Sequence, residues 1–193
     1  MAGFCVTAAL SKLRWTSYHS KMTAVDNDRE RLTGSMKLYL AQHGEAVPKA
    51  EDPERPLSEQ GSRDVRAVAA LLKSAGVRVG RVWHSGKARA EQTARLLAGA
   101  VLPRGRKPQA IEGIGPNTPV AEFSIDADVW EEDTLVVGHL PFMARLVALL
   151  TTGDSEREIV SYYPGSVVCL ERAEAGHWVM LWMIRPDILQ EPK

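Results

Sequence analysis

The sequence predicts an α/β fold: a three-layer α/β/α sandwich whose doubly wound sheet is mostly parallel and ends in an antiparallel hairpin. Strand-like apolar runs alternate with helix-like segments from residue 36 onward, and two further strand-like runs follow each other directly near the C-terminal end. Such alternation is typical of parallel sheets covered by helices on both faces. The chain has 193 residues, 45% of them hydrophobic, which is enough for one well-filled core.

The first strand and the first helix have clear sequence signals. A short apolar run predicts a strand at residues 37–42. Ser58 is a favourable N-cap for a helix at residues 58–75, which Gly76 would end. The apolar residues of this helix recur at helical spacing and predict its buried face: Val65, Val68, Ala69, Leu71 and Leu72.

The alternation continues through two more strands and two more helices. A strand at residues 77–83 is expected to lead into a helix at residues 87–100. That helix would turn its small and apolar side chains inward: Ala90, Ala94, Leu97 and Ala98. A fully apolar strand at residues 134–137 is followed by a helix at residues 141–150, with Pro141 in its first turn.

The C-terminal part reads as a hairpin. Residues 166–171 and 177–184 have strand character and are separated by a short turn at residues 173–176. Trp178 and Trp182 stand four residues apart, which predicts that both lie on one face of the last strand. Without a basic groove beside them, these tryptophans indicate core or sheet cover and not a surface for stacking nucleic-acid bases.

Three polar clusters follow three of the predicted strands. They are QHG at residues 42–44, HSGKAR at residues 84–89 and GH at residues 138–139. Open α/β sheets bind their ligands at the carboxyl ends of parallel strands. We therefore expect the three clusters to converge on one site.

The residue types in these clusters suit phosphoryl chemistry. A neutral imidazole with one nitrogen held by a hydrogen bond can attack phosphorus with the other, and His43 suits this role. Gly44 would allow close approach of backbone and ligand. Arg89 can offer a planar fork to phosphoryl oxygens, and His139 can add a further donor. HEXXH and paired-aspartate motifs are absent from the sequence, so no metal ion or other cofactor is expected.

The segments QHGEA, HSGKARAEQTA and VVGHLP together resemble the motifs of the histidine phosphatase superfamily, also called the phosphoglycerate mutase-like superfamily. The length from Met36 and the segments DPERPLSEQG and GIGPNTPV are similar to those of SixA-type phosphohistidine phosphatases. The resemblance covers nearly all of residues 36–193 and none of residues 1–35.

The resemblance implies a role for each matching residue. His43 would be the phosphorylated nucleophile, Arg89 a phosphate ligand and His139 the second histidine of the pocket. Gln42 stands where the family's Arg-His-Gly triplet has its arginine, so a charge-assisted hydrogen bond worth roughly 1.5 to 3 kcal/mol is lost there. We expect a slower reaction, with Arg55 and Lys87 as candidates for compensating charge.

The general acid has two candidates. Glu112 lies in a segment whose pattern does not match that of the family's phosphomonoesterases, and Glu45 is more simply explained as an exposed loop carboxylate. A phosphohistidine substrate has a nitrogen leaving group that departs readily when protonated, so it has less need of an acid. The resemblance therefore predicts a metal-independent phosphatase that hydrolyses phosphohistidine on a signalling protein. The alternatives are a phosphatase of a small phosphomonoester and a catalytically weak pseudophosphatase that binds phosphate or phosphoproteins.

One domain is expected at residues 36–193, preceded by an N-terminal extension at residues 1–35. The first 25 residues contain no Asp or Glu, a composition that is also found in organellar transit peptides. Met36 is an alternative natural start. We favour the interpretation that residues 1–35 are a tail, or the product of an over-long reading frame, without a function of their own.

Charge and cysteine content restrict the partners and the setting. Lys plus Arg and Asp plus Glu both number 24, so no overall charge attracts nucleic acid or an acidic membrane. The two cysteines lie far apart in the sequence, which favours a reducing compartment, and we expect a cytoplasmic protein. The expected partner is a phosphorylated protein or a small phosphorylated substrate.

Overall fold

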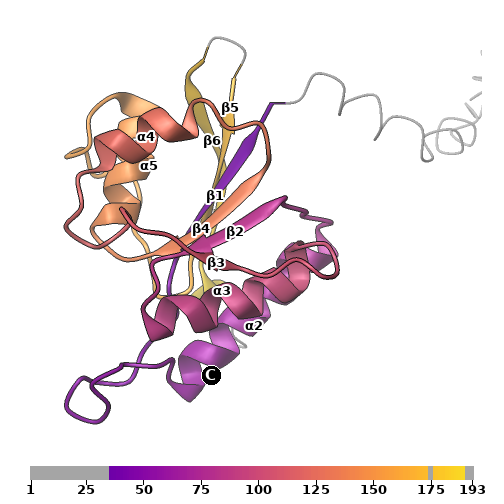
Figure 1. The fold of residues 1–193 in the computed structure, drawn as a ribbon, viewed down its shortest axis with the longest axis vertical. Coiled ribbons are helices and arrows are strands. Elements are labelled where there is room, and N and C mark those ends of the chain that lie inside the picture. Colours follow the sequence, from indigo (N-terminus) through magenta and orange to yellow (C-terminus); the bar gives the residue numbers. More distant parts are fainter. Residues whose placement is uncertain (1–34, 174–175, 190–193) are drawn as a thin grey trace, which may run out of the picture. The chain divides into compact units, whose positions relative to one another are not determined.

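The computed structural model describes residues 35–173 and 176–189 (Figure 1). The prediction of an N-terminal extension therefore lies, except for Ser35, outside the described residues. The elements in chain order are β1 (Lys37–Gln42), α2 (Glu59–Ser74), β2 (Arg81–His84), α3 (Ala88–Val101), β3 (Gln109–Ala110), α4 (Val120–Ala127), β4 (Thr134–Gly138), α5 (Phe142–Thr152), β5 (Val167–Arg172), β6 (Trp178–Ile184) and the 3-10 helix η2 (Pro186–Leu189).

The strands form one six-stranded sheet in the order β3-β2-β4-β1-β5-β6. β3, β2, β4 and β1 are mutually parallel, whereas β5 runs antiparallel to β1 and β6 antiparallel to β5. Strand β4 lies between β1 and β2, and its register pairs Gly138 with Gln42 and Val137 with His84. The three strands therefore end almost level, so the segments that follow them start side by side.

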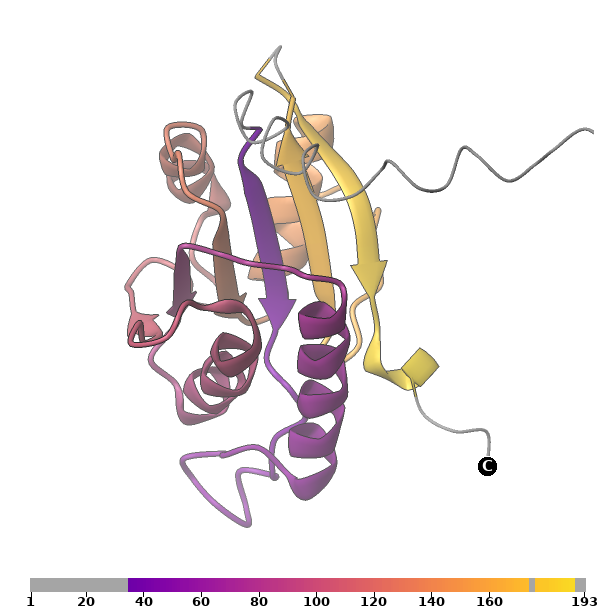
Figure 2. The same ribbon diagram turned by 90° about the vertical axis from the view of Figure 1, so that its right-hand side faces the viewer.

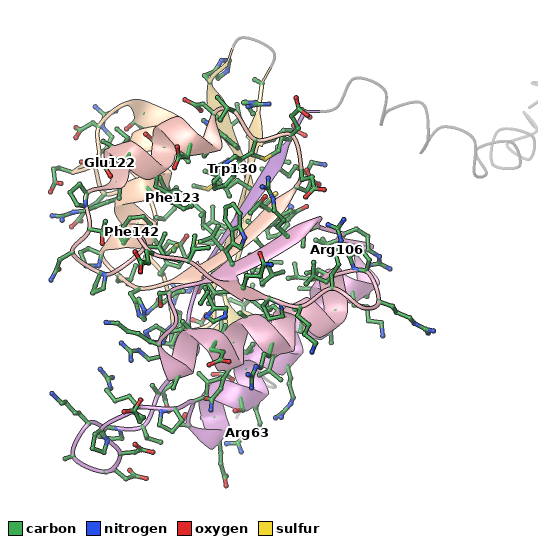
Figure 3. All side chains as sticks on the ribbon, viewed as in Figure 1. Arg63, Arg106, Glu122, Phe123, Trp130 and Phe142 are labelled. Carbon is green, nitrogen blue, oxygen red and sulfur yellow. The ribbon has the colours of Figure 1, made fainter. Side chains whose placement is uncertain are left out.

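Helices cover both faces of the sheet and complete the predicted three-layer α/β/α sandwich (Figure 2). One core lies between the sheet and the pair α2 and α3, and it includes Tyr39, Ala41, Val65, Leu72, Ala94 and Leu97. The other core lies on the side of α4 and α5 and includes Leu38, Leu40, Phe123, Phe142 and Leu146. Phe123 and Phe142 pack edge-to-face there, with ring centroids 5.8 Å apart (Figure 3).

Helix α2 begins and ends at the expected residues. Ser58 is its N-cap and accepts a hydrogen bond from the backbone N–H of Gly61, and Gly76 follows its C-terminal end with a φ of 72°. Four of the five residues predicted for its apolar face are buried: Val65, Val68, Ala69 and Leu72. Leu71 was predicted to be buried as well, but it is 36% exposed.

The structure differs from the predicted elements in three places. The second strand is limited to Arg81–His84, because the residues before it turn back on α2, with Val77 N–H donating to the carbonyl of Leu72. Strand β3 is too short to leave a periodic pattern in the sequence. Helix α4 begins after Pro119 without a side-chain N-cap, so the usual start signal is missing.

The prediction that Trp178 and Trp182 share one face of the last strand is wrong. The pairing shifts between Cys169, opposite Trp182, and Leu170, opposite Met180, which leaves Leu181 as an extra residue in β6. Such a β-bulge reverses the alternation of side chains beyond it. Trp178 consequently packs in the core beside α4 and α5, whereas Trp182 packs against Tyr39 in the core of the opposite face.

Within the described part of the chain, none of the helices combines the length and the apolar character needed to cross a bilayer.

Candidate active site

His43 follows β1 directly and is held at both ring nitrogens. Its Nε2 lies 3.1 Å from Nε of Arg89, and its Nδ1 lies 2.7 Å from the carbonyl oxygen of Gly44. Arginine can only donate, so Nε2 must be the acceptor and Nδ1 must carry the hydrogen that bonds Gly44. The ring is thereby fixed with an unprotonated Nε2, whose electron pair accepts the hydrogen bond from Arg89.

The surroundings of His43 keep its ring neutral. Burial lowers its pKa to about 4, the hydrogen bond to Gly44 opposes this shift, and the positive charges of Arg89, Arg55 and Lys87 add to the lowering. At neutral pH the imidazole therefore retains the electron pair that a nucleophile requires.

His139 follows β4 and lies beside His43. The ring centroids of the two histidines are 4.9 Å apart, and Nε2 of His139 is 2.6 Å from Oγ of Ser85. Burial and the neighbouring His43 lower the pKa of His139 to about 3. His43, Arg89 and His139 come from the three predicted clusters, and the structure brings these three residues together.

Three residues of the segment HSGKARAEQTA support the site in ways that the sequence analysis missed. Thr93 is fully buried; its Oγ1 accepts from Gly44 N–H at 3.0 Å and donates to the carbonyl oxygen of Arg89 at 2.7 Å. Oε1 of Gln92 accepts from the backbone N–H of Leu57 at 2.7 Å, and Ser85 contacts His139. The contacts of Thr93 and Gln92 connect α3 to the segment between His43 and α2. The only signal in the sequence was that these three polar residues belong to one motif-like segment.

Gly44 is required for packing. A Cβ atom at this position would lie 2.8 Å from Cγ2 of Val65 and 3.0 Å from the carbonyl oxygen of Gly61. A Cβ atom at Gly61 would in turn lie 2.1 Å from the carbonyl oxygen of Glu45. Two facing glycines thus let the start of α2 pack directly on the backbone that follows His43.

Gln42 is the last residue of β1 and is 9% exposed. Its backbone N–H donates to the carbonyl oxygen of Ser166 at 3.0 Å. Its side-chain Oε1 is buried and has no hydrogen-bond partner among the described residues. The uncharged Gln42 therefore has a buried amide oxygen that accepts no hydrogen bond from the described residues.

Arg55 lies in the loop between β1 and α2 and has an unusual backbone conformation, with a φ of 52°. Its N–H donates to the carbonyl oxygen of Asp52, and its Nε donates to that of Val47 at 3.4 Å. Burial is the main cause that lowers the pKa values of His43, His139 and Arg89, and the charge of Arg55 adds to the lowering of all three. Arg55 therefore acts electrostatically on the same site.

The two acid candidates have different surroundings. Glu45 accepts a hydrogen bond from Oγ of Ser58 at 2.7 Å, and its carbonyl oxygen accepts from Ser58 N–H, so it supports the start of α2. Glu112 is exposed and follows β3 closely, one residue after Ile111, whose N–H donates to the carbonyl oxygen of His84. Of these two carboxylates, Glu45 accepts a side-chain hydrogen bond, whereas Glu112 has neither a hydrogen bond nor an ion pair with its side chain among the described residues.

His84 has a structural explanation. It is 5% exposed, and its Nδ1 accepts from Gly86 N–H at 3.2 Å, which supports the turn between β2 and α3. Across residues 35–173 and 176–189, no group of three or more His, Cys, Asp or Glu side chains is arranged to hold a metal ion.

Comparison with known proteins identifies the family. The family model for the histidine phosphatase superfamily (branch 1) matches residues 38–112. An uncharacterised protein of Picosynechococcus sp. is 32% identical over 127 residues, covering 62% of this chain and 76% of that protein. The chain belongs to the histidine phosphatase superfamily, branch 1.

Within this histidine phosphatase family, the chain is similar to SixA proteins. The phosphohistidine phosphatase SixA of Escherichia coli is 26% identical over 166 residues, which cover 82% of this chain and 99% of that protein. The solved structure of the protein histidine phosphatase SixA with tungstate is 27% identical, has a TM-score of 0.70, and matches 80% of this chain and 100% of that one.

Proposed function

We propose that this histidine phosphatase hydrolyses phosphohistidine on a protein, without a metal ion, through a phosphorylated His43. The observation that supports this most directly is the fixed, neutral His43 ring, whose Nε2 faces the guanidinium of Arg89 at 3.1 Å. The nucleophile and the proposed phosphate ligand thus lie next to each other, so a phosphoryl group that takes the place of their hydrogen bond would interact with both.

In the first step, the Nε2 electron pair of His43 forms a bond to phosphorus while the bond from phosphorus to the substrate nitrogen breaks. The electron pair of the broken bond stays on the departing imidazole. When the other nitrogen of that imidazole is already protonated, the leaving group departs as neutral imidazole and needs no proton from the enzyme. The hydrogen bond from Nδ1 to Gly44 stabilises the charge that develops on the His43 ring.

In the second step, a water oxygen attacks the phosphorus of phospho-His43. The bond between phosphorus and Nε2 breaks, its electron pair returns to His43, and the water proton leaves with the inorganic phosphate or to solvent. The ring then returns to the neutral state that its low pKa favours. His139 completes the donors on the other side of His43, where the two rings lie 4.9 Å apart.

Three unpaired cations favour an anionic ligand here. Arg89, Arg55 and Lys87 all lower the pKa of both histidines, and none of the ion pairs in the described part of the chain involves any of the three. Gln42 has no charge to contribute, although its amide can still donate a hydrogen bond. We propose that Arg55 and Lys87 supply part of the charge that an arginine at position 42 would provide.

The surroundings of the two carboxylates favour a phosphohistidine substrate over a phosphomonoester. An alkoxide leaving group needs an acid to protonate it. Glu45 already accepts a hydrogen bond from Ser58 at the start of α2, and Glu112 is exposed. SixA of Escherichia coli, to which this chain is similar, is named as a phosphohistidine phosphatase. If the substrate were a phosphomonoester, Glu112 would be the candidate acid.

The neutral Gln42 also supports a second candidate, a module that binds phosphorylated partners with little turnover. The two candidates differ in rate and not in binding. Retention of His43 in a neutral, oriented state favours the enzyme, because binding alone requires no nucleophile.

Relative rates test the substrate class. The protein should release phosphate from a phosphohistidine-bearing protein faster than from p-nitrophenyl phosphate, and His43→Ala should abolish the release. Glu112→Gln should leave the phosphohistidine reaction unchanged within about twofold, because that leaving group needs no acid. Much faster hydrolysis of p-nitrophenyl phosphate, lost in Glu112→Gln, would instead assign a phosphomonoesterase.

A further inference from the structure

The hydroxyl of Thr93 connects the nucleophile of the proposed reaction to its phosphate ligand. It donates its hydrogen to the carbonyl oxygen of Arg89 at 2.7 Å, so an electron pair of Oγ1 remains to accept from Gly44 N–H at 3.0 Å. The carbonyl oxygen of Gly44 accepts from Nδ1 of His43, and Nε2 of His43 accepts from the Arg89 side chain. These hydrogen bonds and the chain segments between them form a closed ring.

Burial makes the Thr93 hydroxyl hard to replace. Thr93 is fully buried, Gly44 is buried as well, and the hydroxyl is the acceptor that the structure shows for Gly44 N–H. Valine has nearly the shape of threonine but offers no acceptor. In Thr93→Val, Gly44 N–H would therefore be buried without a partner, which is unfavourable enough to displace the backbone.

Other backbone hydrogen bonds hold His43 itself. His43 N–H donates to the carbonyl oxygen of Gly138 at 3.0 Å, and the His43 carbonyl oxygen accepts from Gly165 N–H at 3.1 Å. Gly44 follows these bonds in the chain, and a glycine backbone can adopt many conformations. The Gly44 carbonyl oxygen orients the His43 ring, so the ring depends on the bond that restrains Gly44, which Thr93 provides.

Binding of a phosphoryl group would change which bonds hold the nucleophile. Nε2 of His43 can attack only when its electron pair is free, so the ligand must take the place of the Arg89 hydrogen bond. Within the described residues, α3 reaches the His43–Gly44 dipeptide through hydrogen bonds from Arg89 and to Thr93. Once the ligand has displaced the first bond, the bond to Thr93 remains.

We propose that Thr93 is a positioning residue, whose hydroxyl holds Gly44 so that the His43 ring keeps Nδ1 on the Gly44 carbonyl oxygen and Nε2 directed at phosphorus. The proposal rests on the proposed function in one respect, that His43 attacks a phosphoryl group. Thr93 acts through Gly44 and contributes to the rate of the first step more than to the binding of phosphate.

Single-turnover labelling with saturating phosphoramidate, which donates its phosphoryl group and leaves as ammonia, measures the first step directly. In Thr93→Val, acid-labile phosphate should appear on His43 roughly ten- to a hundredfold more slowly, because a displaced nucleophile loses its favourable orientation. The affinity for inorganic phosphate, measured by calorimetry, should stay within about threefold of the wild type, because Arg89 keeps its place in α3.

Two further variants separate the hydroxyl from packing in general. Thr93→Ser keeps the hydroxyl and should be labelled within about threefold of the wild-type rate. Thr134→Val is the matched control, because Thr134 is also fully buried and its hydroxyl donates to the carbonyl oxygen of Glu132, at the end of β4 opposite to the site. This variant loses the same group and should be labelled within about twofold of the wild-type rate.

NMR of the free protein tests the orientation of the ring without requiring turnover. The Nδ1–H proton of His43 is held by Gly44, so it should exchange slowly with water in the wild type and faster in Thr93→Val. Thr134→Val should keep the wild-type exchange rate. If Thr93→Val does not fold, Thr93→Cys, whose thiol is a weak donor and a weak acceptor, takes its place and should show smaller changes in the same directions.

Three results would overturn the proposal. A wild-type labelling rate in Thr93→Val would show that the hydroxyl does not position His43. Equal losses of labelling rate and phosphate affinity would show that Thr93 only holds the pocket together, and equal losses of rate in Thr93→Val and Thr134→Val would show only a general loss of stability. Absence of labelling in the wild type would instead overturn the proposed function, and the exchange of the Nδ1–H proton would still decide whether Thr93 orients the ring.

Discussion

Gln42 is the residue whose contribution to the site is most open to a direct test. It ends β1 beside Gly138, is almost fully buried and carries no charge. A guanidinium at this position would add a charge-assisted donor next to the nucleophile. The proposed site instead relies on Arg89, Arg55 and Lys87 for its positive charge.

Gln42→Arg should tighten the binding of inorganic phosphate roughly ten- to a hundredfold, because one charge-assisted hydrogen bond is gained. Calorimetric titration at fixed ionic strength measures this change. Gln109→Arg adds the same charge at an exposed position of β3 and should have little effect. Equal affinities for wild type and Gln42→Arg would mean that residue 42 does not face the phosphate.

Prediction from sequence succeeded for some residues of the site and not for others. His43, Arg89 and His139 each follow a recognisable strand end within a short motif, so their convergence could be expected. Ser85 could not be assigned, because its contact with His139 depends on β2 lying next to β4. Sequence alone does not contain that strand order.

At the scale of elements, the site depends on how α2 and α3 pack against the loop after β1. Thr93 of α3 holds the backbone N–H of Gly44, and Gly61 of α2 lets the helix contact the backbone of Glu45. Thr93 and Gly61 therefore help to position His43 from two different helices.

Gly61→Ala should destabilise the fold and slow the reaction, because its Cβ would lie 2.1 Å from the carbonyl oxygen of Glu45 and would displace the backbone after His43. Gly99→Ala is the matched control in α3, since no atom lies within 4 Å of the added Cβ, and it should be neutral or stabilising by up to about 1 kcal/mol. Thermal unfolding and phosphate release measure both effects. Equal stability of the two variants would contradict the packing described for Gly61.

Helices and strands could be predicted from the sequence where the residues that define them are neighbours in the chain. Helix α2 has a serine N-cap and a helical apolar pattern, and β4 is a continuous apolar run, so both were expected close to their observed bounds. The bulge in β6 was not predictable, because an extra residue is defined only relative to the partner strand. The placement of Trp182 on the opposite face followed from that bulge.

At the scale of the whole molecule, the buried histidines make stability depend on pH. The folded-state pKa of His43 is lowered to about 4 and that of His139 to about 3, both below the ordinary value of 6.5. At a pH between these lowered values and 6.5, the histidines of the unfolded chain take up protons, whereas those of the folded protein do not. The neutral histidines therefore favour folding most above pH 6.5, and stability is lost as the pH falls from 6.5 towards 4 for His43 and towards 3 for His139.

The double variant His43→Gln/His139→Gln should lose less stability than the wild type between pH 6.5 and about 4.5, because two of the titrating groups have been removed. Urea unfolding at a series of pH values measures the difference, and the remaining acid dependence of the variant serves as the reference. Parallel curves for the two proteins would contradict the lowered histidine pKa values.

The topology explains why one sheet edge can carry the whole site. Strand β4 lies between β1 and β2, so their carboxyl ends deliver His43, His139 and Ser85 next to one another, and α3 adds Arg89. The α/β class and the shared edge were predictable from the alternation of strands and helices. The order of the strands was not.

Direct detection of phosphate on His43 tests the central claim. The protein is incubated with phosphoramidate, quenched in alkali and analysed by mass spectrometry, with His43→Ala treated in parallel. We predict acid-labile phosphate on His43 of the wild type, none in the variant, and release of inorganic phosphate at a rate consistent with turnover of this intermediate. Turnover without phosphate on His43, or tight phosphate binding with neither labelling nor turnover, would contradict the account.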